Sequence, residues 1–327
     1  MLTIEKKIEI SKAAKAWISQ TDPSFSQGQL AKRAGVNVSY VSQIVNGKFE
    51  MQNGKKYAMI GDAQFYRIAK AIDFRFEDEM IWEKVNNYKD IHRVLSKAQR
   101  KSLQYSIQGA SGLGKTFSLE RYCLLTPNAH YIKATENMTS RDLVNTIIHN
   151  LGMSDDFRGN HEKIMAIAHY VTGQKGRHLV IVDEIDRPKR QSGIIGVCKD
   201  LSDAFKGKAA FVMCGANLVN DIRKLAEKNI AGYATLKRRM CRNTFTAASL
   251  LPSEIREVLS AEGIESAGVQ NLLSQKCRDL DSLTDWIRDI REWQESSGKK
   301  ITHQDVYQLL EFDSDPDQSL TTFKKSA

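Results

Sequence analysis

Short apolar runs alternate with helical patterns in the middle of the chain. Four runs have the length and composition of strands: 103–108, 129–134, 178–186 and 209–217. Helical periodicity occupies the intervening stretches 117–125 and 139–152. Because continuous apolar runs are typical of buried parallel strands, the alternation predicts a parallel α/β sheet with ligands at the carboxyl ends of its strands.

Amphipathic helical patterns continue after these runs. One segment begins at Pro252, and proline is favoured in the first turn of a helix. Helical periodicity is found over 252–263, 266–277, 280–296 and 302–312. The pattern therefore predicts a small helical domain behind the sheet, followed by a flexible polar tail, 313–327.

The N-terminal segment 24–50 contains two short helical patterns separated by a glycine. Ser26 is placed to cap the first helix, and Gly35 ends it. Either Asn37 or Ser39 can cap the second. Apolar residues at helical spacing would face inward: Leu30, Ala31, Val36, Val41 and Ile44. Two helices joined in this way predict a helix-turn-helix.

The second helix of this pair would present polar side chains to its surroundings: Ser39, Tyr40, Gln43 and Asn46. Such side chains reach base edges or phosphates when the helix lies in the major groove. The order LA..AGV....VS.I.NG resembles the Cro and lambda-repressor type of helix-turn-helix, and 63–72 resembles its closing helix. We therefore predict DNA binding, against the alternative of a helical packing module. The insert 47–61 is either a wing on the phosphate backbone or a solvated loop.

A glycine-rich stretch, 109-GASGLGKTF-117, follows the first predicted strand and fits the pattern GxxxxGK[ST] in full. Glycines allow backbone N–H groups to turn toward phosphates, and the following helix N-terminus adds a favourable dipole. Lys115 would reach the β- and γ-phosphates of ATP, and the Thr116 hydroxyl would hold Mg²⁺. The expected nucleotide-binding residues are Gly109, Ala110, Ser111, Gly112, Leu113, Gly114, Lys115, Thr116 and Phe117.

Two later strands supply candidate catalytic side chains. The run 178-HLVIVDEID-186 ends in acids, so that Asp183 would lie beside Mg²⁺ and Glu184 would deprotonate the attacking water. The alternative is an acidic pair that only solvates the strand end. The run 209-AAFVMCGAN-217 ends at Asn217. Its side chain would hold the attacking water or the γ-phosphate. The alternative is that Asn217 only forms a turn.

Composition sets limits on partners and compartment. The 327-residue chain has a formal net charge of +9 and a pI near 9.2, so an anionic partner such as nucleic acid fits. Its five cysteines are widely spaced, which disfavours a disulfide framework or a zinc site. The N-terminal residues lack the apolar core of a signal peptide, and no segment approaches a membrane span of about 20 apolar residues. We expect a cytoplasmic protein without membrane contact.

Strand, phosphate loop, DE-ended strand and Asn-ended strand in this order resemble the core of AAA+ ATPases, over roughly residues 90–310. The resemblance implies an arginine finger that acts in trans on a neighbouring subunit. Arg239 best matches the family spacing and Arg238 is the second choice, although DNA contact or plain surface charge would also explain this cluster. The lid arginine of the family falls where this chain has Thr284, and Arg288 is the candidate replacement.

The resemblance and the patterns together define the expected organisation. The fold class is α/β, an AAA+ P-loop parallel sheet with a helical lid, preceded by an all-α helix-turn-helix domain. The expected bounds are 1–82 for the helix-turn-helix domain, 83–102 for a linker and entry helix, 103–245 for the nucleotide-binding core, 246–312 for the lid and 313–327 for the tail.

A helix-turn-helix followed by one compact AAA+ core resembles the Mu B-like family of transposition proteins, whose broader relatives include IstB and TnsC. This resemblance implies ATP-dependent assembly as a filament or ring on target duplex DNA with little sequence preference. It also implies recruitment and activation of a transposase, and release by hydrolysis. Lys133, Thr139 and Arg141 would contact the DNA backbone, or they are ordinary surface residues.

Three other functions fit some of the same residues. A helicase loader or replication initiator is also an ATP-switched, DNA-binding AAA+ protein, and its partner would be a replicative helicase. A transcription regulator would use ATP only as a ligand and would bind a defined operator through residues 26–46. A metabolic P-loop enzyme would use the helix-turn-helix for packing alone.

Overall fold

The computed structural model divides into two compact units, which are described separately. The first comprises Met1–Glu79 together with Glu120–Ala129, and the second comprises Met80–Leu119 and His130–Ala327. The structure describes residues 2–20, 25–53, 56–72, 74, 82–153, 157–174, 176–229, 232–302, 304–306 and 308. The predicted tail, 313–327, lies outside these residues.

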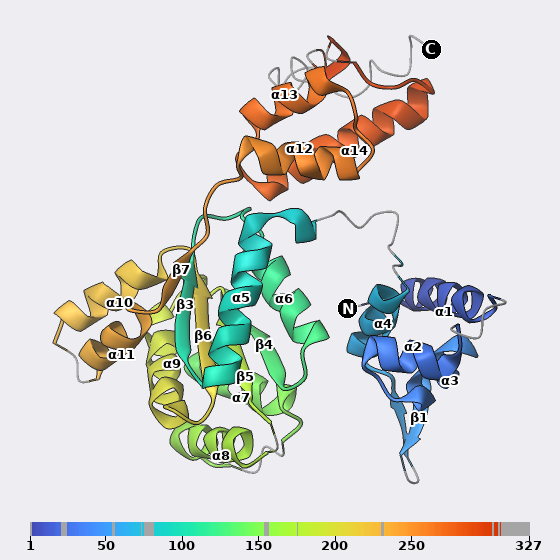
Figure 1. Cartoon of the computed structure of the whole chain (residues 1–327). Coiled ribbons are helices and arrows are strands. Elements are labelled where there is room, and N and C mark those ends of the chain that lie inside the picture. The colour runs from blue at the N-terminus through green and yellow to red at the C-terminus, as the bar shows by residue number, and fades with distance from the viewer. Residues whose placement is uncertain are drawn as a thin grey trace. The chain divides into compact units, whose positions relative to one another are not determined.

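The first unit consists mainly of four helices and a hairpin (Figure 1). Its elements are α1 (Ile4–Ile18), α2 (Gln27–Ala34), α3 (Val38–Val45), β1 (Glu50–Asn53), β2 (Lys56–Met59) and α4 (Asp62–Ala71). The strands β1 and β2 pair antiparallel, with Glu50 opposite Met59. The unit is therefore not all-α as expected, because the predicted insert forms a two-stranded ribbon.

The helix-turn-helix is formed by α2 and α3. The Ser26 side chain caps α2 by accepting a hydrogen bond from the backbone N–H of Gln29 at 3.3 Å. Gly35 ends the helix with φ 62°, a left-handed conformation that favours glycine. Of the two candidate caps for α3, Asn37 takes the role, since its Oδ1 accepts from the Ser39 N–H at 2.9 Å.

The second unit contains a five-stranded sheet with its helices and then a helical lid. It begins with a 3₁₀ turn, η1 (Trp82–Lys84). The core elements are α5 (Asn86–Lys101), β3 (Gln104–Gln108), α6 (Lys115–Leu125), β4 (Ala129–Lys133), α7 (Ser140–Asn150), α8 (Asn160–Gly173), β5 (Leu179–Asp183), α9 (Gln191–Phe205), β6 (Ala210–Gly215), α10 (Leu218–Glu227), α11 (Tyr233–Met240) and β7 (Thr244–Thr246). Of these, the part of α6 from Glu120 onward and the first residue of β4 are grouped with the first unit. The lid elements are α12 (Pro252–Ala261), α13 (Ala267–Lys276) and α14 (Leu280–Ser297).

The sheet confirms the predicted α/β class. Its strand order is β4-β5-β6-β3-β7, and the pairs β3–β6, β5–β6 and β3–β7 are parallel. All four predicted strands are present, whereas the short edge strand β7 had no apolar run to signal it. Since β3, β5 and β6 run in the same direction, their carboxyl ends meet at one edge of the sheet.

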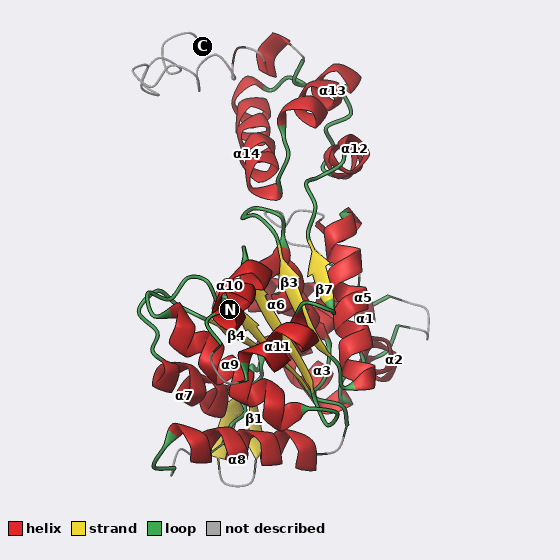
Figure 2. Cartoon of the chain, turned by 90° about the vertical axis from the view of Figure 1, so that its left-hand side faces the viewer, coloured by secondary structure: helices red, strands yellow, loops and turns green. Residues whose placement is uncertain are grey.

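The two central strands β5 and β6 are fully buried. Every residue of β5 and β6 is buried, as expected for strands covered on both faces. Figures 1 and 2 show α5 over one face of the sheet and α9 over the other. The core on the second face joins β5 and β6 to the apolar sides of α7, α8 and α9. This packing fixes the strand ends that carry the candidate site.

The lid has an apolar core of its own, which includes Ile255, Leu273 and Ile287 from its three helices. Val85 and Trp82, which precede α5, pack into the same core. The first three predicted lid helices are observed, while most of the fourth, 302–312, lies outside the described residues.

Candidate nucleotide-binding site

The phosphate loop, residues 109–116, connects β3 directly to α6 as the sequence predicts. Gly112 and Gly114 have φ angles of 77° and 75°, in the left-handed region where only glycine is unstrained. A Cβ on Gly114 would lie 2.6 Å from Leu280 Cδ1 of the lid. The backbone conformation therefore favours glycine at both positions, and Gly114 leaves room for the Leu280 side chain. Backbone N–H groups in a loop of this kind can bind phosphates.

Lys115 begins α6 and folds over this loop. Its Nζ donates hydrogen bonds to the carbonyl oxygens of Gly109 at 2.7 Å and Ala110 at 2.6 Å. The ammonium group is therefore held at the loop, and Lys115 as a whole is half-buried. The three N–H donors of the ammonium group can bind phosphate oxygens in place of these carbonyls with only a small movement of the side chain.

The two predicted metal ligands lie in contact. Thr116 Oγ1 donates to Asp183 Oδ2 at 2.8 Å, which joins the start of α6 to the end of β5. A hydroxyl and a carboxylate at this spacing are oxygen ligands of the kind that Mg²⁺ takes beside a bound phosphate. The donor set accordingly fits the expected Mg²⁺–ATP.

Asp183 is only 1% exposed, and its carboxylate is satisfied on both oxygens. Besides Thr116, the Tyr131 hydroxyl donates to Oδ2 at 3.0 Å, and the Glu184 N–H donates to Oδ1 at 2.8 Å. Burial, and next the charge of Asp183, raises the pKa of the neighbouring Cys214 thiol well above its usual value. That thiol consequently stays neutral, so it adds no second negative charge beside Asp183.

Glu184 has a strained backbone. Its φ is 58°, a left-handed conformation that costs a residue with a Cβ roughly 1–2 kcal/mol. Its side chain is 29% exposed and forms an ion pair with Arg187 Nε at 3.3 Å. The strain is stored at the residue expected to act as general base, which is where functional sites commonly tolerate it.

Asn217 is exposed at the start of α10, immediately after β6. The turn that carries it is held by Asp186, whose Oδ2 accepts from the Ala216 N–H at 2.7 Å. The Ile185 N–H also donates to the Cys214 carbonyl at 3.0 Å. These two hydrogen bonds connect the loop after β5, which carries Glu184, to the loop after β6, which carries Asn217.

Tyr131 and Asp186 have clear roles at the site that the sequence reasoning did not assign. Asp186 stands in the same acidic run as Asp183 and Glu184, so its position gave a usable signal. Tyr131 lies on β4, where a lone tyrosine in a strand resembles any core residue. Its hydrogen bond to Asp183 depends on strand pairing, which local sequence does not reveal.

The lid touches the phosphate loop through the start of α14. The Leu280 N–H donates to the Gly112 carbonyl at 2.7 Å, and Asp279 caps the helix by accepting from the Ser282 N–H. Asp281 Oδ2 lies 3.1 Å from the position that a Cβ on Gly112 would take. The lid therefore brings aspartates to this loop, in the region where an arginine was sought.

The two candidate replacements for the lid arginine have other contacts. Thr284 Oγ1 donates back to the Leu280 carbonyl at 2.6 Å, within its own helix. Arg288 forms an exposed ion pair with Asp285 at 3.5 Å. Neither contact reaches the phosphate loop, and a role for either residue in nucleotide binding stays a prediction.

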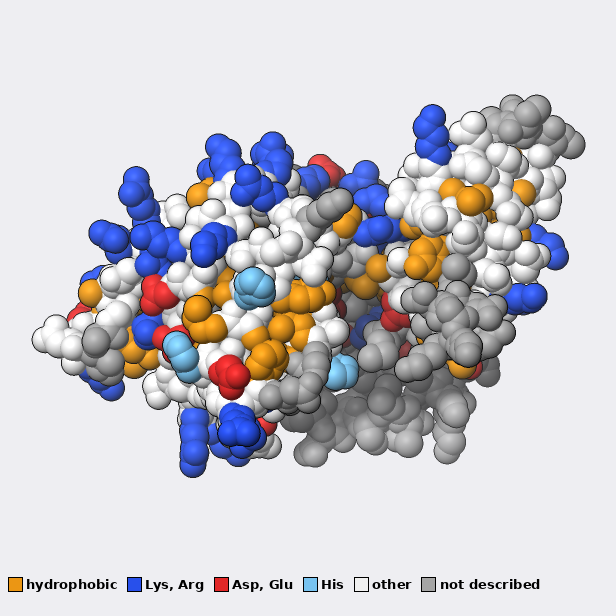
Figure 3. Space-filling view, turned by 90° about the horizontal axis from the view of Figure 1, so that it is seen from below, with side chains coloured by type: hydrophobic (Ala, Val, Ile, Leu, Met, Phe, Trp, Pro, Cys, Tyr) orange, Lys and Arg blue, Asp and Glu red, His pale blue; other side chains and the backbone are white. Residues whose placement is uncertain are grey.

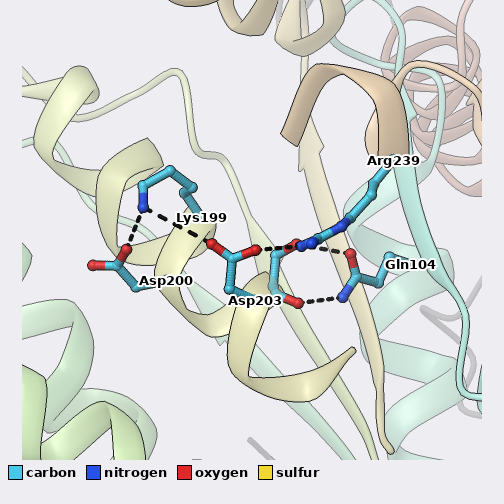
Figure 4. Close-up of polar contacts among 6 residues, drawn as sticks. Gln104, Lys199, Asp200, Asp203 and Arg239 are labelled. Carbon is cyan, nitrogen blue, oxygen red and sulfur yellow. Dashed lines mark hydrogen bonds and ion pairs between the residues drawn. The ribbon is translucent and has the colours of Figure 1, made fainter. Parts of the chain in front are cut away.

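The two candidate finger arginines differ sharply. Arg239 Nη1 donates to Asp203 Oδ1 at 2.6 Å and to Ser202 Oγ at 3.2 Å, and its side chain is 17% exposed (Figure 4). Gln104 at the start of β3 completes this network through Ser202. Arg238, the neighbouring residue on α11, is exposed. The geometry favours Arg238 over Arg239 for contact with another subunit.

The candidate DNA-contacting residues fall on both units. In the first unit, Ser39 is exposed, while Tyr40 and Gln43 are half-buried, with Tyr40 packed against the core. In the second, Lys133 and Arg141 are exposed, at the end of β4 and in the first turn of α7.

Thr139, the remaining DNA candidate, has a structural role. It caps α7 through a capping box with Asp142, accepting from the Asp142 N–H at 3.3 Å. Asp142 is a hydrogen-bond acceptor for the Thr139 side chain and backbone, and these contacts lower its pKa. The spacing of these two residues was a cap signal in the sequence.

Comparisons with known proteins agree with this geometry. Residues 100–222 match the AAA domain family. The Mu-like prophage FluMu DNA transposition protein B of Haemophilus influenzae is 27% identical over 168 residues, which is 51% of this chain and 57% of that protein. The chain thus spans little more than half the length of this relative.

Solved structures with similar folds include two archaeal proteins. The Aeropyrum pernix ORC1 protein in complex with DNA has a TM-score of 0.48 at 17% identity, covering 68% of this chain and 63% of that one. Cdc6p from Pyrobaculum aerophilum has a TM-score of 0.49 at 13% identity, covering 65% of this chain and 62% of that one.

Within the described residues, no helix is long and apolar enough to cross a membrane.

The parallel sheet, the glycine loop and the Thr116–Asp183 pair, with the AAA domain match, define the class as an AAA+ ATPase. Within this class the chain is similar to a Mu-like DNA transposition protein B.

Proposed function

We propose that the chain is an ATP-dependent DNA-binding ATPase of DNA transposition. It assembles on target duplex DNA with little sequence preference, engages and activates a transposase, and leaves the DNA after ATP hydrolysis. The observation that carries the nucleotide-dependent part is the 2.8 Å contact between Thr116 and Asp183 below the lysine-bearing loop. The transposition part is supported by similarity to a protein named as DNA transposition protein B.

In this proposal the chain's own residues bind and orient Mg²⁺–ATP. Thr116 and Asp183 would hold the metal, and Lys115 would neutralise the terminal phosphates. Bound Mg²⁺–ATP supplies a phosphoryl group that transfers to water. Glu184 would accept the proton of that water, and Asn217 would orient it from the next strand end. Tyr131 and Asp186 keep the metal ligand and the Asn217 turn in place.

DNA contact is proposed for the helix-turn-helix of the first unit and for exposed cations of the second. The formal net charge of +9 favours contacts with phosphates, which bind many sequences alike. Ser39, Tyr40 and Gln43 belong to the helix that would approach the groove, whereas Lys133 and Arg141 would touch the backbone.

Electron microscopy of the protein with random-sequence duplex DNA tests this function. With ATP and Mg²⁺ we expect continuous protein coats on the DNA, which disappear as ATP is consumed. A single bound particle at one defined sequence would instead identify a regulator. Pull-down of a replicative helicase, without effect on a transposase, would identify a helicase loader or initiator.

Arg238→Ala is expected to suppress hydrolysis by the assembled protein by about 10³- to 10⁵-fold, the range for a trans-acting arginine, while sparing ATP binding. Arg239→Ala is the matched control. It removes the same group from the next position but also breaks the Asp203 contact. It should therefore lower the melting temperature, while the activity per folded molecule changes little. ATPase assays at rising protein concentration, with thermal unfolding, separate the two. Loss of hydrolysis in the folded Arg239 variant alone would assign the finger to Arg239.

A further inference from the structure

Asn87, in the first turn of α5, is a buried polar residue outside the nucleotide-binding motifs. Its exposed fraction is only 7%. An asparagine at a helix start commonly caps the helix, but Val85 occupies the N-cap position of α5, and the described residues provide no side-chain cap there. The place of Asn87 in the helix therefore does not explain why a polar side chain is buried at this point.

The Asn87 amide has three hydrogen bonds. Its Nδ2 donates to the Ala248 carbonyl at 2.8 Å and to the Leu113 carbonyl at 3.3 Å, and its Oδ1 accepts from the Ala248 N–H at 3.1 Å. Both amide hydrogens and the amide oxygen are thereby used. The opposite orientation would turn the oxygen toward two carbonyl oxygens, so these contacts fix which way the amide lies.

The partners of Asn87 belong to two segments that are distant in the sequence. Leu113 lies in the phosphate loop, 26 residues after Asn87. Ala248 lies in residues 247–251, named here the connecting segment, which leads from β7 to the lid helix α12. One side-chain amide therefore joins the phosphate loop to the segment that enters the lid.

The hydrogen bond to the Leu113 carbonyl orients the peptide between Leu113 and Gly114. In a planar trans peptide the carbonyl and the N–H point in opposite directions. Because Asn87 holds the carbonyl on one side, the Gly114 N–H faces the other side. Among the described residues this N–H donates to no acceptor, so it is available to a ligand. Accepting a hydrogen bond also polarises a peptide, which makes its N–H a stronger donor.

The preceding peptide of the loop is held in a similar way by the lid. The Gly112 carbonyl accepts from the Leu280 N–H at 2.7 Å. The other end of that peptide, the Leu113 N–H, likewise donates to no acceptor within the part of the chain that the structure describes. Two successive carbonyls are thus held from outside the loop, and two successive N–H groups are left for an anion.

We propose that Asn87 is a positioning residue for ATP, whose amide orients the Leu113–Gly114 peptide so that the Gly114 N–H donates to a phosphate oxygen. This inference rests on the ATP binding in the proposed function and adds to it a residue outside the phosphate loop. The same amide holds Ala248, so the orientation of this peptide and the path of the connecting segment depend on one side chain.

The alternative is that Asn87 only anchors the connecting segment. Its two hydrogen bonds with Ala248 are shorter than the one with Leu113. Loss of such an anchor would lower the melting temperature without changing the affinity for phosphates. The contact with Leu113 favours the positioning role, because an anchor for the connecting segment needs no hydrogen bond to the phosphate loop.

Two substitutions separate these roles. Asn87→Ala removes all three hydrogen bonds and should weaken ATP binding about tenfold. Asn87→Asp keeps the shape of the side chain, but its carboxylate would face two carbonyl oxygens. At neutral pH it should therefore bind ATP at least as weakly as Asn87→Ala. Titration with a fluorescent ATP analogue and Mg²⁺, below the melting temperature of each variant, measures the dissociation constants.

The pH dependence of Asn87→Asp tests the hydrogen-bond donor directly. A protonated carboxyl group regains an O–H donor, and burial raises the pKa of a carboxyl group. At about pH 5.5 the dissociation constant of Asn87→Asp should therefore move toward that of the parent protein at the same pH. The ratio between Asn87→Ala and the parent should not change with pH. A side chain that only filled space would show no such recovery.

Asn86→Ala is the matched control. Asn86 is exposed, and its backbone N–H donates to Glu254 Oε1 at 2.6 Å, a hydrogen bond that the substitution keeps. This variant makes the same chemical change one position earlier in α5. It should bind the ATP analogue like the parent protein.

DNA binding without ATP is a second control. Lysine and arginine side chains gather over the left part of Figure 3, the side on which Figure 1 shows α10 and α11. Asn87→Ala changes no charge and lies at a buried position, so it leaves such exposed cations in place. DNA binding that depends on them and not on ATP should stay at the parent level.

The outcomes distinguish this inference from the proposed function. Folded Asn87→Ala protein with the parent affinity for the ATP analogue overturns the positioning role, and so do equal losses in Asn86→Ala and Asn87→Ala. If Asn87→Ala does not fold, Asn87→Asp still decides, since an affinity that fails to recover in acid overturns the role. A parent protein that binds DNA equally with and without ATP contradicts the proposed function instead, and leaves the ATP-binding result for Asn87 unaffected.

Discussion

Lys115→Ala is expected to abolish ATP-dependent DNA binding. The Lys115 ammonium lies over the phosphate loop with two backbone carbonyls as its partners, and we expect phosphate oxygens to replace them. Hydrogen bonds to charged groups contribute about 1.5–3 kcal/mol each, so losing the ammonium should weaken ATP binding roughly ten- to hundredfold or more. Titration with a fluorescent ATP analogue, and DNA anisotropy with and without ATP, measure the two effects.

Lys101→Ala is the matched control for this prediction. Lys101 is the last residue of α5 and is exposed, so its removal changes the net charge equally but leaves the loop intact. A small, ATP-independent loss of DNA affinity is expected for Lys101→Ala. Full ATP-dependent DNA binding by folded Lys115→Ala protein would contradict the proposal that ATP bound at this loop controls DNA binding.

The sequence was sufficient for the parts of the site that depend on local chemistry. A glycine loop between a strand and a helix needs its glycines for backbone reasons, and polar residues at strand ends follow from where parallel strands finish. For this reason the Thr116–Asp183 contact was predictable from two motifs 67 residues apart, once both were placed on one parallel sheet.

Contacts that depend on strand order or on helix rotation could not be predicted in this way. Tyr131 reaches Asp183 only because β4 lies next to β5, and β7 was too short to give a pattern. Arg238 and Arg239 differ by about 100° around one helix. Packing of α11 beside α9 decides which of them meets Asp203, and family spacing alone had favoured the one that is held in its own chain.

The charge of the lid residues beside the phosphate loop also differs from the expectation. The family resemblance implies that the lid contributes a cation near residue 284 to its own nucleotide. The structure instead places Asp279 and Asp281 next to Gly112. Acids at this position leave the positive charge to come from elsewhere, and the exposed Arg238 of a neighbouring copy is the group that we propose.

Glu184→Gln is expected to trap the protein on DNA. Glutamine has nearly the same size as glutamate but cannot accept the proton of the attacking water. Loss of a general base slows catalysis about 10²- to 10⁴-fold, while Lys115, Thr116 and Asp183 remain to bind Mg²⁺–ATP. We expect normal ATP-dependent loading and a lifetime on DNA that lengthens with the loss of hydrolysis. Phosphate release, and dissociation after excess competitor DNA is added, measure the two quantities.

Two features make this variant a sharp test. Glutamine at φ 58° has the same backbone cost as glutamate, so the melting temperature should change little. Glu136→Gln is the matched control, since Glu136 is an exposed acid that pairs with Lys189 outside the nucleotide site. It should hydrolyse ATP and leave DNA like the parent protein. If Glu184→Gln also turns over normally, another group takes the proton; if it stops hydrolysis yet leaves DNA at the parent rate, hydrolysis is not what releases the protein.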